Sequence, residues 1–320
     1  MSSEGAAPEP AQPIEEVAAH LADSGQQLSN ASLAGLNDLK SSELAYFKGR
    51  WPDIEDERRQ QIVSRLVELA EQDPRLSFDV IFKDLLSDND AAVRRLAVEG
   101  LWENEETAVI SLLADVLAAD SDTEVRAAAA KTLAHFAAMA TLGKLRPEAE
   151  QKLRRVLFEA TAEKNPTEVR RRAMEAAAPL NLPSLRDTIK EAYTSRDPRF
   201  KSSAIYAMGA SGDPIWLPVL VAELKSQHPE TRYEAATACG ELADESTVPY
   251  LVKLLGDEDI EVRLAATRAL GEIGGEAARK ALQRCLQSSS DAVRELAAQA
   301  LSQLEAAEEG LSFLLEEEEF

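Results

Sequence analysis

Residues that could do metal or nucleophilic chemistry are sparse in this sequence of 320 residues. Cys239 and Cys285 each fall in an apolar pattern, which is typical of buried thiols in a reducing cytoplasm. The histidines occur as His20-Leu21, His135-Phe136 and His228-Pro229. None of these residues has the spacing of a metal site or of a nucleophile beside a base. The sequence therefore predicts no catalytic residue, no bound metal and no cofactor.

A row of basic residues at near-constant spacing is the second candidate for chemistry, because regularly placed guanidinium groups could bind an anion. The row consists of Arg94, Arg126, Arg170, Lys201, Arg232, Arg263 and Arg294. The successive spacings are 32, 44, 31, 31, 31 and 31 residues. An aspartate recurs shortly before most members, at a position between two apolar runs. We therefore expect the row to be a structural ladder that joins neighbouring repeats, with anion binding as the less favoured alternative.

The spacing of the ladder belongs to an internal repeat of about 31 residues. An alanine follows three residues after every basic residue: Ala97, Ala129, Ala173, Ala204, Ala235, Ala266 and Ala297. Each repeat divides into two helices separated by a short polar turn. Four aspartates stand where an N-cap of the second helix is expected: Asp90, Asp122, Asp197 and Asp259. Gly209, Gly240 and Gly271, near the ends of second helices, suit helix termination or close packing.

A helical wheel assigns two faces to each second helix. Counted from the basic residue, positions −1, +2, +3, +6 and +7 cluster on one side and predict the packed face, as with Val262, Ala265, Ala266, Ala269 and Leu270. Positions +1, +5 and +8 lie opposite and vary between repeats. The residue types enriched at binding hot spots occur among them. We expect a partner groove at Trp102, Arg95, Arg171, Glu175, Tyr206, Tyr233 and Arg268. The alternative, that these are scattered surface residues, stays open.

The remainder of the chain flanks or interrupts this repeat region. Residues 1–30 are predicted to be a disordered, Ala/Pro-rich acidic tail, 31–74 a helical capping region and 75–304 the repeat array. The long spacing marks an insertion near 137–148, whose apolar residues are expected to fold back locally. Trp51 is expected to pack as a staple before the capping helix, and Trp216 to lie in the core.

The last segment, 305–320, is predicted to be an acidic C-terminal tail. Its apolar residues are Phe313, Leu314, Leu315 and Phe320. They could cap the last repeat, or they could form a short motif that docks on a basic, apolar groove of a partner. The sequence leaves both alternatives open.

Charge and hydropathy restrict the partners. The formal net charge is −22, of which residues 1–30 contribute −5 and residues 305–320 contribute −7. Nucleic acid is therefore an unfavourable ligand, because binding it requires clustered positive charge. No apolar run reaches the roughly 18 residues of a membrane span, and residues 1–27 do not resemble a signal peptide. We expect a cytoplasmic monomer that binds protein partners, including partners with a basic surface.

The order of Asp, Val-Arg, Ala and Leu at fixed offsets resembles HEAT repeats of the type named after phycobilisome lyases. The resemblance covers about residues 75–304, and the whole chain resembles uncharacterised bacterial HEAT-repeat proteins. It implies an all-α fold: an α-solenoid of about seven two-helix repeats plus a degenerate N-terminal capping repeat. It also implies protein binding along a concave surface lined by second helices.

Enzymatic relatives of this repeat type supply the rival functions. Deoxyhypusine hydroxylase is similar in design but needs His-Glu pairs for its irons, and this sequence contains none. DNA glycosylases built on similar repeats need a basic groove. Phycobilin lyases offer no short motif to require or exclude. The favoured function is a non-catalytic scaffold or adaptor. The alternatives are an enzyme or enzyme accessory of the phycobilin-lyase or oxidoreductase-associated kind, and an acidic mimic of nucleic acid.

Overall fold

The computed structural model describes residues 13–318, with side chains described through residue 307. Within these described residues, all secondary-structure elements are helices and none is a strand. The chain divides into two compact units, Met1–Val156 and Leu157–Phe320, and the division falls inside helix α9. None of the described helices combines the length and the hydropathy that crossing a membrane requires.

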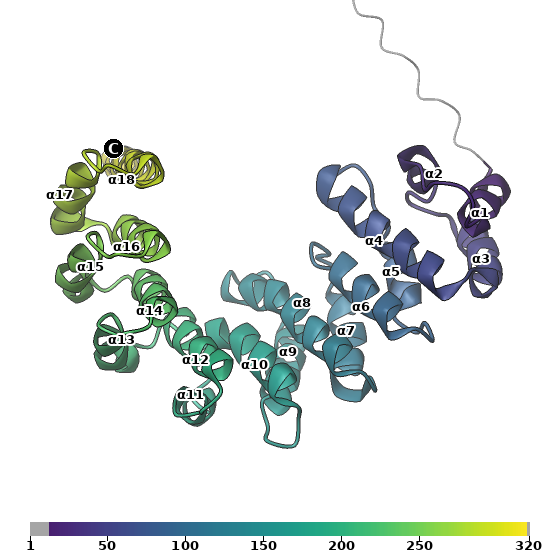
Figure 1. Cartoon of the computed structure of the whole chain (residues 1–320), viewed down its shortest axis with the longest axis horizontal. Helices are drawn as coiled ribbons and strands as arrows, with labels where there is room; N and C mark the ends of the chain where they lie inside the picture. The colour runs from purple at the N-terminus through teal and green to yellow at the C-terminus, as the bar shows by residue number, and fades with distance from the viewer. Residues whose placement is uncertain (1–12, 319–320) are drawn as a thin grey trace, which may run out of the picture. The chain divides into compact units, whose positions relative to one another are not determined.

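Unit 1 contains two rows of helices from α3 onward (Figure 1). Helices α4, α6 and α8 pack on one another in sequence, and α5 and α7 pack behind α6 and α8. The elements are α1 (Ile14–Ala22), α2 (Asn30–Ala34), α3 (Ser41–Arg50), η1 (Trp51–Asp53), α4 (Asp56–Gln72), α5 (Asp79–Leu85), α6 (Ala91–Gly100), α7 (Thr107–Ala119), α8 (Thr123–Thr141) and α9 (Pro147–Ala160).

Unit 2 repeats the same two-row arrangement, which is the layering of an α-solenoid. Its elements are α10 (Thr167–Ala177), η2 (Ala178–Leu180), α11 (Leu185–Tyr193), α12 (Pro198–Ala210), η3 (Pro214–Trp216), α13 (Leu217–Glu223), α14 (Pro229–Leu242), η4 (Glu245–Thr247), α15 (Val248–Leu254), α16 (Ile260–Ile273), α17 (Gly275–Cys285) and α18 (Asp291–Glu318). The second helices α10, α12, α14, α16 and α18 form the inner row of this unit, and α11, α13, α15 and α17 form the outer row (Figure 1). We call the surface of α10, α12, α14 and α16 that faces away from the outer row the inner face.

The packed side of the second helices is the one that the wheel predicts. In the repeat of α16, Val262, Ala265, Ala266, Ala269 and Leu270 are all at most 1% exposed. Small alanines allow the helices of adjacent repeats to approach closely, so each repeat covers the apolar side of the next. The four predicted caps are also present. The carboxylates of Asp90, Asp122, Asp197 and Asp259 each accept a backbone N–H of the first helical turn.

Two glycines mark the closest approach between second helices of unit 2. A Cβ at Gly209 would come within 2.5 Å of the Ala238 Cα, and one at Gly240 within 2.9 Å of the Ala269 Cα. Neither glycine ends its helix, so their predicted role in close packing is the one observed. Position +8, which the wheel placed on the variable side, is therefore a helix–helix contact in these repeats.

The N-terminal part is more ordered than the sequence suggested. The predicted disordered tail includes α1, which buries Ile14, Val17 and Leu21 against the elements that follow. Three apolar residues on one helical face can be buried when a neighbour covers them, even in an acidic Ala/Pro-rich segment. Residues 1–12 lie outside the described part of the chain.

The insertion mostly lengthens helices. Helix α8 continues to Thr141, a turn through Gly143 follows, and α9 begins at Pro147. Ala137, Met139, Ala140 and Leu145 are buried, whereas Leu142 is 68% exposed.

At the C-terminus, the backbone from residue 305 to Glu318 continues α18. The side chains of Phe313, Leu314 and Leu315, and all of Phe320, lie outside the described residues.

Candidate functional site

The arginine ladder lies at the turns that join first to second helices. The Arg94 guanidinium donates to both carboxylate oxygens of Asp120, at 2.7 and 2.8 Å, and to the Asp88 carbonyl of its own turn. Arg232 repeats the arrangement with Asp257, at 2.8 and 2.7 Å, and with the Ser226 carbonyl. Each of these arginines thus bridges its own turn to the turn of the next repeat.

Other ladder residues vary this arrangement according to the residue available in the next turn. Arg126 donates to the Leu117 carbonyl, and Arg170 to the Thr161 carbonyl and the Glu191 carboxylate. Lys201 lies 2.9 Å from Glu223. Arg263 and Arg294 donate to carbonyls of their own turns. These contacts tie each of these ladder residues to the turns around it.

The sequence missed one bridge of the same kind. Arg59 of α4 donates to both oxygens of Asp88, at 3.0 and 2.8 Å, as Arg94 does to Asp120. The repeat signature was hidden because Ile62 stands three residues after Arg59, where the other repeats have alanine. Trp51 donates to the same carboxylate and packs at 5.0 Å from Phe47. The sequence did contain a sign of this bridge. Asp88 stands two residues before the N-cap Asp90, which is the position that Asp120 and Asp257 hold in the other bridged turns.

The predicted groove residues are divided between the two units. Arg95 and Trp102 belong to unit 1. Trp102 is 46% exposed, and Arg95 lies 2.6 Å from Glu99 on the same helix. Arg171, Glu175, Tyr206, Tyr233 and Arg268 belong to unit 2, where they line successive second helices. Trp216, expected in the core, is 3% exposed.

On α10 the predicted groove residues neutralise one another. The Arg171 guanidinium lies 2.6 Å from Glu168 and 3.2 Å from Glu175. Arg172 pairs with the same two carboxylates. Ser203 of α12 receives a hydrogen bond from Arg171 and donates one to Glu175. This end of the inner face is therefore a closed polar network with balanced charge.

Beyond α10 the inner face becomes acidic. Tyr206 of α12 has a raised pKa because it is partly buried and faces the carboxylates of Glu241, Glu175 and Glu234. Burial also raises the pKa of Glu234, against a hydrogen bond with Ser202 that lowers it. Partial desolvation on the inner face, together with the charges of Glu272 and Glu234, raises the pKa of Glu241 to about 7, although its side chain is exposed to solvent. These carboxylates, which lie on α10, α14 and α16, repel one another across the inner face.

Glu234, Glu241 and Glu272 were not predicted as site residues. Glu234 occupies position +2, which is predicted to face the core and holds Ala or Leu in four other repeats. The charge of Glu234 at a position expected to face the core could have indicated a site residue. Glu272 uses the space left by Gly240, because a Cβ there would lie 2.2 Å from its Oε2 atom. Partial desolvation beside α14 raises the pKa of Glu272, and the charge of nearby Arg268 partly offsets the effect.

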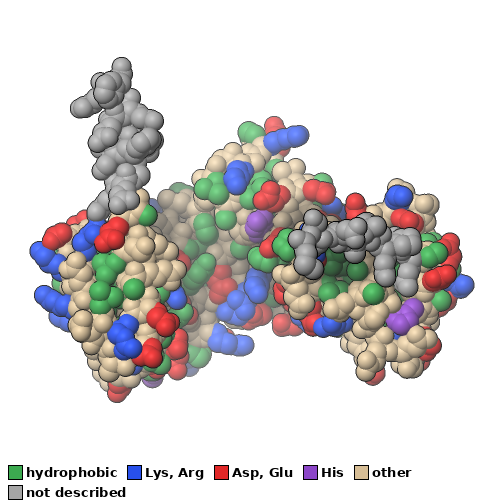
Figure 2. Space-filling model, turned by 90° about the horizontal axis from the view of Figure 1, so that it is seen from above, with side chains coloured by type: hydrophobic (Ala, Val, Ile, Leu, Met, Phe, Trp, Pro, Cys, Tyr) green, Lys and Arg blue, Asp and Glu red, His purple; other side chains and the backbone are tan. Residues whose placement is uncertain are grey.

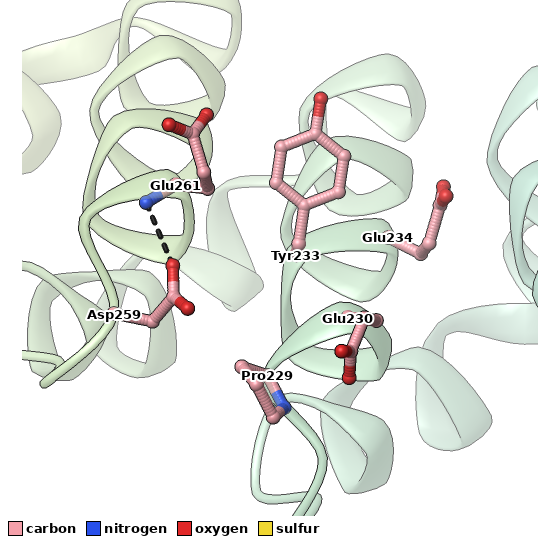
Figure 3. Close-up of a pocket in the computed structure, with 6 residues that line it drawn as sticks. All are labelled: Pro229, Glu230, Tyr233, Glu234, Asp259 and Glu261. Atoms are coloured by element: carbon pink, nitrogen blue, oxygen red, sulfur yellow. Dashed lines mark hydrogen bonds between the residues drawn. The ribbon is translucent and has the colours of Figure 1, made fainter.

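A cavity of about 320 Å³ lies beside Tyr233, at the N-terminal ends of α14 and α16. It is lined by Pro229, Glu230, Tyr233, Glu234, Asp259 and Glu261. Figure 3 shows the Tyr233 ring between the two helices, with Glu261 beside it on α16 and Glu234 on its other side. The Asp259 carboxylate accepts the Glu261 backbone N–H at 2.8 Å, so it is engaged as the helix cap. The lining also includes the carboxylates of Glu230, Glu234 and Glu261, and no basic side chain lines the cavity.

The described part of the chain contains no arranged metal site, and its two cysteines are buried. Among those residues, no group of three His, Cys, Asp or Glu side chains is placed to hold a metal ion. Cys239 and Cys285 are free and buried, and burial raises the pKa of Cys239 to about 12. Over the described residues seen in Figure 2, acidic and basic side chains are interspersed with hydrophobic ones.

Comparison with known families identifies the repeat. The family described as HEAT repeats matches residues 78–158 and 217–302. No curated protein sequence matches the chain.

Several solved structures are similar to this chain at low sequence identity. The complex of CpcE and CpcF of phycocyanin lyase from a Nostoc species is 19% identical with a TM-score of 0.50, covering 73% of this chain and 97% of that one. Importin beta is 14% identical with a TM-score of 0.49, covering 91% of this chain and 46% of that one. Human deoxyhypusine hydroxylase is 19% identical with a TM-score of 0.35, covering 92% of this chain and 96% of that one.

Proposed function

This chain belongs to the HEAT-repeat family, and on that premise we propose that it is a non-catalytic scaffold or adaptor that binds protein along the inner face of its second helices. Stacked repeats of this kind create extended surfaces whose outward residues are free to vary while the packed side is conserved in character. Because fold alone does not set function, the proposal depends on the side chains of that surface.

The observation that carries the proposal is the composition of the inner face in unit 2. Tyr206, Tyr233 and Arg268 occupy it, and Tyr and Arg are enriched at the energetic centres of protein interfaces. The apolar side of the same helices is already buried against neighbouring repeats. The inner-face residues are therefore available to a partner without any loss of the core.

Affinity purification with the full chain tests this function. The Tyr206→Ala, Tyr233→Ala double variant is expected to lose its partners, and Tyr250→Ala on the outer-row helix α15 is the matched control. Trp102→Ala tests unit 1 separately. Equal recovery of the same partners by the double variant and by the wild type would remove the inner face as the binding surface.

The second candidate function is a lyase or an accessory to tetrapyrrole attachment. The observation that favours it is the structural likeness to the CpcE and CpcF complex of phycocyanin lyase. Titration of the purified chain with a free bilin, followed by visible absorbance, separates the two functions. A saturable spectral shift would favour the lyase-type function, and an unchanged spectrum would favour the scaffold.

A further inference from the structure

We propose that the inner face of unit 2 binds a basic protein segment and takes one of its arginine or lysine side chains into the cavity beside Tyr233. This inference rests on the proposed scaffold function and names the chemistry of the partner. The binding surface runs along α14 and α16, from the cavity at their N-terminal ends to Glu241 and Glu272 near their C-terminal ends.

The cavity has the groups that recognise a cationic side chain. Tyr233 offers an aromatic ring, over which a guanidinium or ammonium group is attracted by the ring's negative face. Glu234 and Glu261 stand on either side of that ring (Figure 3). A cation stacked on the ring can therefore donate charge-assisted hydrogen bonds to a carboxylate at the same time.

These carboxylates lack a basic partner within the described part of the chain. No ion pair joins Glu230, Glu234 or Glu261 to a Lys or Arg there, whereas on α10 Glu168 and Glu175 are paired with Arg171 and Arg172. The contrast lies within one unit and one row of helices. The negative charge of the inner face is thus balanced at α10 and unbalanced around the cavity, at the N-terminal ends of α14 and α16, where a positive partner gains most.

Two other cationic or anionic partners fit less well. The described acidic side chains do not form a group arranged to hold a metal ion. A nucleic acid would bring its phosphates against these carboxylates. A basic protein segment brings both a cation for the cavity and a backbone that can extend along the face.

The length of the face sets the spacing of basic residues in the partner. Tyr233 and Glu241 are eight residues apart on α14, which corresponds to about 12 Å at the helical rise of roughly 1.5 Å per residue. An extended chain advances about 3.3 Å per residue, so the second cation is expected about four residues after the first. There it would meet Glu241 and Glu272, with Arg268 and Tyr206 as the neighbouring groups.

A labelled peptide tests the inference on the full chain. The probe is a twelve-residue Gly/Ser/Thr peptide with arginine at positions four and eight, followed by fluorescence anisotropy at low ionic strength up to about 1 mM. We expect saturable binding that weakens with added salt and falls at least tenfold when citrulline replaces both arginines. Tyr233→Ala, and separately Glu234→Gln with Glu261→Gln, should each weaken binding at least tenfold. The double Gln variant preserves shape, so it keeps the test valid if Tyr233→Ala unfolds the chain.

Matched controls separate the site from its surroundings. Tyr233→Phe keeps the ring and should retain binding, as should Tyr250→Ala on α15 and Glu276→Gln on α17. Absence of saturable binding, equal binding of the citrulline peptide, or indifference to both site variants would each overturn the inference. Partner capture that requires Tyr206 and Tyr233, without any arginine-peptide binding, would leave the scaffold function standing and remove only the basic segment.

Discussion

Asp257 joins two repeats of unit 2 through a buried ion pair with Arg232. Both side chains are at most 10% exposed, and the hydrogen bonds from Arg232 lower the pKa of Asp257. Removing one partner leaves an unpaired buried charge, so Asp257→Asn should destabilise the folded chain by about 3 kcal/mol. Urea unfolding measures this. Glu258→Gln is the control, because the Glu258 side chain is 89% exposed and lies 3.8 Å from the same guanidinium; a comparable loss there would contradict the assignment.

The raised pKa of Glu241 makes the free energy of unfolding decrease as pH rises, whereas a carboxyl with a lowered pKa, such as Asp257, has the opposite effect. Its folded-state pKa of about 7 lies above the ordinary value of 4.5, because of partial desolvation on the inner face and the charges of Glu272 and Glu234. The folded state therefore retains a proton that the unfolded state releases, and this advantage is full below pH 4.5 and lost as pH rises to about 7.

The Glu241→Gln variant tests that coupling. It should be more stable than the wild type at pH 8, and the difference should shrink at pH 5, because glutamine carries no charge to desolvate. Thermal unfolding of both proteins at the two pH values gives the comparison. A difference that does not change with pH would mean that the carboxyl titrates normally.

At the scale of single helices, Gly209 sets how closely α12 and α14 can pack. Because an added Cβ would meet the Ala238 backbone at 2.5 Å, Gly209→Ala should destabilise unit 2 by about 1–3 kcal/mol despite its better helix propensity. Gly49→Ala in α3 is the control, since nothing lies within 4 Å of its added Cβ. That change should be stabilising by about 0.5–1 kcal/mol in urea unfolding. Equal signs for the two substitutions would contradict the close-packing role.

The sequence predicted the helices wherever residues close together in the chain determine the structure. The alanine period and the capping aspartates located second helices, because close packing and first-turn N–H groups demand those residue types. Helix α1 was missed because four buried apolar residues are too few to outweigh an acidic, Pro-rich composition. The cavity beside Tyr233 was only half predicted. Tyr233 followed from its variable position, whereas Glu234 and Glu261 depend on how α14 and α16 face each other, which no single-helix pattern contains.

At the scale of the whole chain, the family match and the sequence period differ in extent. The HEAT family matches 78–158 and 217–302, which leaves out α10 and α12. Those repeats depart from the common pattern at Pro166, where the N-cap is expected, and at Lys201, where arginine is expected. Ala173 and Ala204 still lie fully buried in them. The spacing of small residues therefore reveals the divergent repeats more reliably than the motif does.

Ser288 has a consequence for the order in which the chain opens. In the turn before α18 it stands where Asp257 stands one repeat earlier, so Arg263 reaches no carboxylate in that turn and the last two repeats lack the bidentate link. In a linear array each repeat is held only by its neighbours, so a missing link lowers the local free energy of opening. Amide hydrogen exchange should be faster in α17 than in α15, and Ser288→Asp should slow it. Unfolding would then begin at the repeat of α17 and α18 and proceed toward α15 and α16, because Ser288 in the turn before α18 provides no carboxylate for Arg263.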